Sequence, residues 1–378
     1  MATLDVARID AAGFRRELDA LRAETIASLG PNDYRHLRKM EWAGRGLTLL
    51  GYALAWIAVN PVSVVAIALG ITARWMLMHH IGHGGYDRVP GVPARYTKKH
   101  FALGGRRWLD WFDWIEPSAW NHEHNHLHHY HTSEPADPDL VDRNLVRLRD
   151  LRAPRWFKWI ALFVGGSLWK LWYYAPSALN GLTAKDRLAK GAPHQHFVNT
   201  YNFWDLRDPL VRRLWTWSVA PYALFHFVIV PCAFLPLGTG AATAVLINRV
   251  LAEVLANLHT FFVIVPSHTA SDLIAFEGPI RSKDEFYLRQ ALSTANYPTG
   301  GDTNDFLHMW INYQIEHHLF PDLPMTKYRA IQPRVKAICA TYGVPYIQES
   351  AGARFLRLVD VCTGHADMPR WRPVAQAA

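Results

Sequence analysis

The hydrophobic residues of this chain gather into a few long runs that polar segments separate. The first run covers 46–78 and is interrupted only at Asn60-Pro61, a dipeptide typical of turns. Two later runs cover 214–237 and 240–265. Because a helix needs about 20 residues to cross a bilayer, the pattern predicts four transmembrane helices in two hairpins. Their predicted bounds are 42–59, 62–79, 214–237 and 240–265. One long kinked helix is the alternative for the first two.

The polar segments predict the rest of the architecture. Residues 1–41 are polar and helix-prone, 42–330 would form the membrane domain, and 331–378 are a polar tail. Inside the membrane domain, 155–174 mixes cations, aromatic and aliphatic residues, which favours a helix lying in the membrane interface. We therefore expect an all-α integral membrane protein with a helical cap outside the bilayer.

The charges indicate on which side this cap lies. Lys and Arg accumulate in the polar segments beside the runs, whereas the turns at Asn60-Pro61 and Gly238-Thr239 carry none. The positive-inside rule then predicts that the cap and both termini are cytoplasmic. A formal charge of +8 would suit nucleic acid or an anionic membrane face, but the 16 Trp favour the membrane. Nucleic acid is not an expected partner.

Histidine, not cysteine, is the residue that indicates chemistry. The three cysteines, Cys232, Cys339 and Cys362, lack metal-site spacing and are expected to be free thiols. The chain has 20 histidines, and they concentrate in three clusters, at 79–83, 122–131 and 314–321. Each cluster lies just outside an apolar run on the same predicted side. Because imidazole binds iron, zinc, copper and nickel, the clusters predict a metal centre at the membrane surface.

The clusters resemble the three histidine boxes of membrane fatty acid desaturases. The first box, H-x-x-x-H, matches 79–83, and the second, H-N-x-x-H-H, matches 124–129. The third box matches its Q-x-x-H-H form at 314–318. This family usually has one more histidine between the second and third boxes, for which His268 fits best and His259 is the alternative. The resemblance implies eight metal ligands: His79, His83, His124, His128, His129, His268, His317 and His318.

The resemblance also implies the reaction. It predicts two iron ions, O2 as co-substrate, and two electrons from an external donor such as a ferredoxin or a cytochrome b5-like protein. The substrate would be the acyl chain of a fatty acid or lipid, which is desaturated. An alkyl C–H bond has no acidic proton, so no separate acid or base is expected beside the di-iron centre. Hydroxylation by the same kind of centre is the alternative, because both reactions begin by removing one hydrogen.

Other residues near the boxes are less certain ligands. Gln314 stands where other third boxes have His, so it would contact the metal weakly or through water. His80, Asn125 and His259 are expected to support the ligands or to face the substrate. The isolated histidines are not expected to form a site: His100, His194, His196, His226, His308 and His365.

Two other function classes compete with the oxygenase. His122-Glu123 and His126 fit the H-E-x-x-H motif of zinc metalloproteases, but that motif leaves the first and third clusters unexplained. A metal transporter or store could also use His-rich loops. It would need polar ligands within its spans, whereas nearly all of these histidines lie beyond them.

Overall fold

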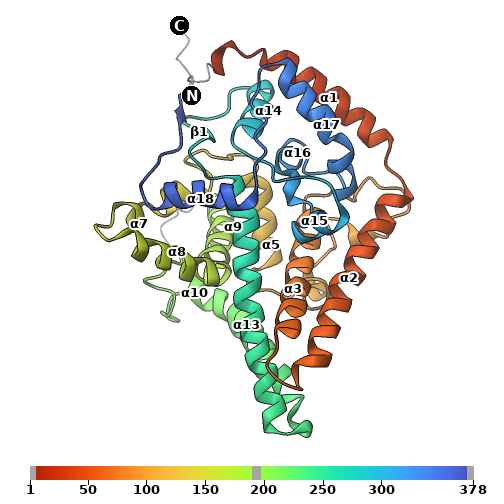
Figure 1. Cartoon of the computed structure of the whole chain (residues 1–378), viewed down its shortest axis with the longest axis vertical. Helices are drawn as coiled ribbons and strands as arrows, with labels where there is room; N and C mark the ends of the chain where they lie inside the picture. Colours follow the sequence, from red (N-terminus) through yellow and green to blue (C-terminus); the bar gives the residue numbers. More distant parts are fainter. Residues whose placement is uncertain (1–5, 190–196, 373–378) are drawn as a thin grey trace.

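The described part of the chain is mostly helical (Figure 1). The computed structural model describes residues 6–189 and 197–372. Within these residues only two short strands, β1 (Ala275–Phe276) and β2 (Arg370–Trp371), pair, and they do so in parallel. Long helices form the narrow lower half in Figure 1, and shorter helices form a broad cap above them. The predicted all-α fold is confirmed.

The first apolar run forms a helical hairpin. Helix α2 (Pro31–Ala55) ends before the Asn60-Pro61 turn, and α3 (Pro61–Gly82) begins at the proline of this turn. Asn60 caps α3 because its side-chain oxygen accepts a hydrogen bond from the Ser63 amide (2.8 Å). The alternative of one long kinked helix is therefore wrong.

The two helices of this hairpin approach closely. A Cβ atom at Gly51 would lie 2.5 Å from Ile67 Cγ1, and one at Gly70 would lie 2.2 Å from Thr48 Oγ1. The absence of these two side chains lets the helix backbones pack together, so α2 and α3 are held in one register.

The third and fourth apolar runs form a second hairpin. Helical residues run from Pro209 to Cys232 and then turn at Gly238, whose φ of 108° suits glycine. The helical elements are α10 (Pro209–Leu214), α11 (Ala220–Leu224) and α12 (Val230–Cys232), joined by π-helical turns at Trp215–Val219 and Phe225–Ile229. Each π turn directly precedes an element with a proline near its start. The wider turn accommodates a ring that cannot donate a backbone hydrogen bond. Helix α13 (Thr239–Ile264) returns towards the cap.

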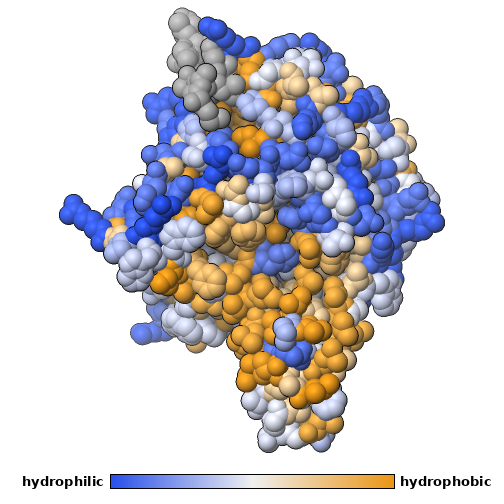
Figure 2. Space-filling model, viewed as in Figure 1, coloured by the Kyte–Doolittle hydropathy of each residue, from blue (hydrophilic) through white to orange (hydrophobic). Residues whose placement is uncertain are grey.

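Three helical stretches of the described chain are long and apolar enough to cross a membrane, namely Pro61–Gly82, Pro209–Leu237 and Thr239–Ser267. They correspond to the second, third and fourth predicted spans. The predicted first span, 42–59, is not among them, because α2 starts in polar sequence and carries Arg45 paired with Glu41 (2.9 Å). Figure 2 shows hydrophobic surface over the lower half of the molecule and mostly hydrophilic surface over the cap.

Buried charges within the helical bundle are paired. Arg249 forms a 2.7 Å ion pair with Glu253 one turn later on α13. Glu253 also accepts hydrogen bonds from Trp114 (2.7 Å) and Tyr222 (2.8 Å). An unpaired buried charge is costly, so these contacts stabilise the charged Arg249 and Glu253 side chains. The same contacts join α11, α13 and the loop before the second histidine cluster.

Short helices build the cap around the upper ends of α3 and α13. They are α1 (Ala11–Ala27), α4 (Arg107–Asp110), α5 (Pro117–His122), α6 (Val141–Asn144), α7 (Val146–Asp150), α8 (Arg155–Trp169), α9 (Ala175–Ala189), α14 (Lys283–Leu292), α15 (Asp302–Leu307), α16 (Gln314–Leu319), α17 (Met325–Thr341) and α18 (Ala351–Cys362). Helix α8 exposes Trp156, Ile160 and Phe163. This exposed apolar face is the one expected of a helix that lies in a membrane interface. All three cysteines are free thiols, as predicted.

Candidate metal centre

Four segments that are far apart in the sequence bring the eight predicted histidines together, all of them buried. The end of α3 carries His79 and His83, and the turn after α5 carries His124, His128 and His129. His268 follows the helical stretch Thr239–Ser267, and α16 carries His317 and His318. The histidines form two adjacent groups, and within each group the ligating nitrogens lie within 4.8 Å of one another. One group is His79, His83, His124, His129 and His317, and the other is His128, His268 and His318.

The second histidine box owes its geometry to a π-helical turn, Glu123–His128. The His129 amide donates to the His124 carbonyl five residues earlier (3.1 Å). Because a π turn holds more residues than an α turn, positions four and five residues after His124 can both face the same side as His124. The H-x-x-x-H-H spacing therefore delivers three imidazoles to one region, where an α-helix would direct the last one away.

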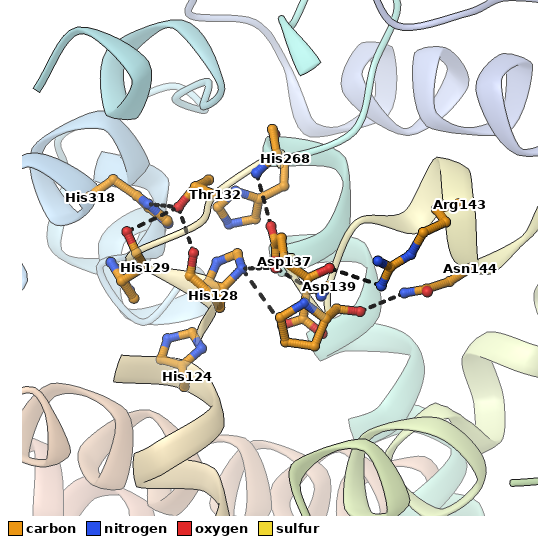
Figure 3. A network of polar contacts seen from close by, with 12 residues as sticks. His124, His128, His129, Thr132, Asp137, Asp139, Arg143, Asn144, His268 and His318 are labelled. Carbon is orange, nitrogen blue, oxygen red and sulfur yellow. Dashed lines mark hydrogen bonds and ion pairs between the residues drawn. The ribbon is translucent and has the colours of Figure 1, made fainter. Parts of the chain in front are cut away.

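The Nδ1 atoms of the imidazoles contact fixed partners. His128 Nδ1 donates to Asp137 Oδ1 (3.0 Å), as Figure 3 shows. His318 Nδ1 lies 2.8 Å from Gln290 Oε1. The Gln290 orientation is supported at its other end, where Nε2 donates to the His129 carbonyl (2.9 Å). His317 Nδ1 lies 3.2 Å from the hydroxyl of Tyr328. Such partners fix the tautomer and ring orientation of metal-binding histidines.

The nitrogens that face the centre of the cluster fit a metal ion. Among the described residues, Nε2 of His83, His124 and His318 is buried and has no hydrogen-bond partner. His79 Nε2 and His317 Nε2 lie only 2.9 Å apart. Two imidazole nitrogens bound to one ion at about 2.1 Å and at a right angle are separated by about 3 Å. The donor set therefore suits a cation between them.

The electrostatics favour the neutral, metal-binding form of most of these rings. Burial, and then the neighbouring imidazoles, lower the pKa well below its ordinary value for His83, His124, His129, His317 and His318. Burial, followed by His128 and Arg354, does the same to the pKa of His268. At His128 burial opposes the charged form, but the Asp137 carboxylate raises the pKa above its ordinary value.

The less certain residues lie around the two groups. Asn125 donates to the Gly82 carbonyl (3.0 Å), which ties the second box to the first. Gln314 Nε2 lies 2.6 Å from His268 Nε2, at the edge of the smaller group. His80 contacts a backbone carbonyl, that of Met309 (3.0 Å).

His259 lies outside both groups. Its Nε2 is 2.8 Å from the Leu307 carbonyl oxygen. The structure thus brings His268, and not His259, to the other ligand candidates. The pair His122 and His126 of the H-E-x-x-H motif also joins neither group, so the described chain builds no metal group around that motif.

The isolated histidines His100, His226, His308 and His365 likewise belong to no metal-binding group of the described chain. His194 and His196 lie outside the described residues.

Sequence reasoning missed the residues that hold the imidazoles. Asp137 and Asp139 follow the second box within the run Pro-Ala-Asp-Pro-Asp, and their closeness to the box was an available signal. Asp139 also forms a third possible metal-binding group with His124 and His128. Gln290 and Tyr328 carry no local signal of their roles, because only the fold brings them to the boxes.

A cavity of about 490 Å³ opens onto the cluster. His79, His124, His128 and His268 lie in its wall. The rest of the wall is mainly aromatic and aliphatic, with Trp75, Trp169, Tyr174, Leu162 and Phe261 among its residues. Its volume is in the range of small-molecule sites, and such walls suit hydrocarbon.

Comparison with known proteins adds a family match. Residues 53–350 match the family model described as fatty acid desaturase. A NADPH-dependent stearoyl-CoA 9-desaturase of Mycobacterium tuberculosis (strain ATCC 25618 / H37Rv) is 26% identical over 350 residues, which cover 87% of this chain and 74% of that protein. An sn-1 linoleoyl-lipid 6-desaturase of Arthrospira platensis is 24% identical, with 88% and 87% covered. A chloroplastic acyl-lipid (7-3)-desaturase of Chlamydomonas reinhardtii is 27% identical, with 80% and 56% covered.

Proposed function

Because the chain belongs to the fatty acid desaturase family, as the resemblance of its histidine boxes predicted, we propose that it desaturates the acyl chain of a fatty acid or lipid at a di-iron centre, with O2 and two external electrons. The observation that supports this most is the pair of buried histidine groups in contact with one largely apolar cavity. Acid–base groups alone cannot attack an alkyl chain, whereas a redox metal can.

The two histidine groups would hold one iron ion each. Bound iron would supply the activation of O2 that removes hydrogen from an unactivated methylene pair. The protein would contribute fixed imidazole positions, through the contacts of Asp137, Gln290 and Tyr328 with the rings. Gln314, next to His268, would contact the metal weakly or through water.

The cavity would hold the acyl chain against the cluster. Its aromatic wall, with Trp75 and Tyr174 both buried, would exclude water from the reacting carbons. Exposed Asn144 and Asn199 lie at its rim. We place the polar head of the substrate at this rim, because amide side chains can hydrogen-bond to an ester or thioester that has no place in the apolar interior.

The membrane arrangement is part of the proposal. Helix α2 would complete a four-helix membrane domain by packing on α3. The cap and both termini would then face the cytoplasm, where the basic surface would bind an acidic electron donor such as a ferredoxin or a cytochrome b5-like protein. Salt would slow that association, because it screens exposed charges.

Lipid profiling of host cells with and without the protein tests the proposal. Mass spectrometry should detect an acyl chain with one additional double bond only in cells that express the protein. A new hydroxyl group in place of the double bond would indicate hydroxylation instead. An unchanged lipid profile, with the protein present in the membrane and loaded with iron, would contradict both.

A further inference from the structure

Of the eight ligand candidates, all within the described chain, only His268 comes alone on its segment. The others come in sets of two or three, on α3, on the π turn with the residue after it, and on α16. His268 instead follows a short 3-10 helix, Val265–Ser267, and precedes an irregular loop. Pro266 has no amide hydrogen, so it adds no backbone hydrogen bond to this turn. The position of His268 therefore depends on contacts from other segments.

Arg354 of α18 contacts the chain on both sides of His268. Its Nε donates to the Pro266 carbonyl (3.2 Å), two residues before the histidine. Its Nη1 donates to the carboxylate of Asp272, four residues after the histidine, whose two oxygens lie 2.7 and 2.8 Å away. A guanidinium presents its donors in a fixed planar fork, so one side chain sets the spacing between the two contacts. Arg354 thereby closes residues 266–272 into a loop that contains His268.

The Arg354 side chain is a buried charge, with none of its surface exposed. Its partner Asp272 is 9% exposed. An apolar pair of similar volume is often as stable as a buried ion pair, because desolvation offsets the attraction. Stability alone therefore gives no reason for a charged side chain at this place. The fixed directions of the guanidinium donors give one, because they specify the geometry of the loop.

Arg354 belongs to a part of the chain that its sequence marked only as a polar tail, 331–378. The family match ends at residue 350, so Arg354 lies beyond it. The same tail also contacts the third histidine box, because the Tyr346 hydroxyl donates to Glu316 Oε1 (2.7 Å). Glu316 directly precedes His317 and His318. Two contacts of the tail thus end beside ligand candidates of the smaller group, His268 and His318.

We propose that Arg354 is a positioning residue for the smaller metal-binding group. Its contacts hold the 266–272 loop so that the His268 ring stays beside His128 and His318, at centroid distances of 4.9 and 4.7 Å. The inference rests on the proposed function, because it requires one metal ion in each histidine group. The larger group takes no ligand from this loop. Loss of the Arg354 contacts therefore weakens one metal position and leaves the other intact.

Two matched variants test this selectivity. Arg354→Met removes the guanidinium that holds the loop. Arg155→Met removes a guanidinium that pairs with Asp360 of the same helix α18 (2.5 Å), at a site where Arg155 is 49% exposed. That ion pair does not involve the His268 loop. For wild type and both variants, iron per chain is measured against chelator concentration in membranes with equal protein levels.

The proposal predicts the loss of one iron and not of both. Arg354→Met should release one iron per chain at an about tenfold lower chelator concentration than wild type, the low end of the range for partners of metal-binding histidines. The other iron should be retained as in wild type, and Arg155→Met should match wild type for both. Unchanged release from Arg354→Met, or joint release of both irons as in general destabilisation, would overturn the positioning role. A wild type that binds fewer than two irons would overturn the proposed di-iron centre instead.

A second variant covers the case in which Arg354→Met fails to fold. Arg354→Lys keeps the buried charge beside Asp272 but has no planar fork, so it cannot hold Pro266 and Asp272 in the same geometry. Hydrogen exchange of full-length wild type and Arg354→Lys is compared by mass spectrometry. Peptides that cover 265–273 should exchange faster in the variant, whereas those of the π turn Glu123–His128 should exchange alike. Unchanged exchange over 265–273 would contradict the proposal.

Discussion

Replacing Asp137 with Asn tests whether the carboxylate positions His128 for metal binding. Asp137 is buried and accepts three hydrogen bonds, from His128 Nδ1 (3.0 Å), the Asp139 amide (2.8 Å) and the Ser133 amide (2.9 Å). Both carboxylate oxygens are used. The Asn side chain has nearly the same shape but only one acceptor oxygen, so its NH2 group must face one of these donors.

The size of the effect follows from this mismatch. A buried donor left without an acceptor costs about 1–3 kcal/mol. Loss of a partner behind a metal-binding histidine typically lowers metal affinity by about 10–100-fold, which corresponds to about 1.4–2.7 kcal/mol. The two estimates agree, so we expect Asp137→Asn to weaken iron binding within that range while the protein remains folded.

Asp142→Asn is the control, because this buried carboxylate pairs with Arg370 (3.0 Å) and belongs to no metal-binding group of the described chain. The assay is chelator competition, with iron per chain measured against chelator concentration for wild type and both variants. We expect Asp137→Asn to lose iron at clearly lower chelator concentrations than Asp142→Asn. Equal retention in Asp137→Asn and wild type, or a larger loss in Asp142→Asn, would refute the positioning role of Asp137.

Three further predictions concern the ligands, their protonation and the topology. His268→Ala should abolish lipid oxidation and reduce bound iron, whereas His259→Ala should change only the rate or the chain-length preference. His226→Ala should be nearly silent. If His259→Ala loses iron and activity while His268→Ala keeps both, the wrong ligand was named. Metal-free protein should have a lower Tm at acidic pH. Burial lowers the imidazole pKa values in the folded state, whereas the unfolded chain has the ordinary value of about 6.5. Below that pH the unfolded state binds more protons than the folded state, so the free energy of unfolding falls as the pH drops towards the folded-state pKa values. A Tm that stays constant on acidification would contradict this. A tag at Lys98-Lys99 should be reached by a membrane-impermeant reagent only from the cytoplasmic side, and labelling in intact cells would overturn the four-span arrangement.

Local sequence patterns were enough for the hairpin of α2 and α3 and for the clustering of the histidines. Asn60-Pro61 both ends one apolar run and caps the next helix, so the hairpin is visible in the sequence. The histidine spacing similarly reflects short-range geometry, four residues apart in α3 and four or five apart in the π turn. These features depend on neighbours along the chain.

Hydropathy was a poorer guide to where helices end. The apolar pattern placed a helix over 42–59, but α2 begins at Pro31 and ends at Ala55. A polar sequence can form a helix as readily as an apolar one, so the start of the apolar run does not mark the start of the helix. Hydropathy also gives no sign of the paired charges Arg249 and Glu253, which lie inside the mostly apolar helix α13.

The supporting contacts of the site could not be found from local patterns. Gln290 reaches His318 and the His129 carbonyl from α14, and Tyr328 reaches His317 from α17. These partners are common residue types without distinctive spacing, and only the packing of the cap brings them to the imidazoles. The cavity beside the histidine cluster is likewise a product of packing between helices.

The histidine-held metal centre is tested most directly by the double variant His317→Ala/His318→Ala. This change removes one imidazole from each of the two metal-binding groups. Product formation from a defined lipid, bound iron and protein level are measured on the same membranes as for wild type. We predict a new double bond and close to two irons per chain in wild type, and no product from the double variant at equal protein level. Wild-type product formation by the double variant would contradict the whole account.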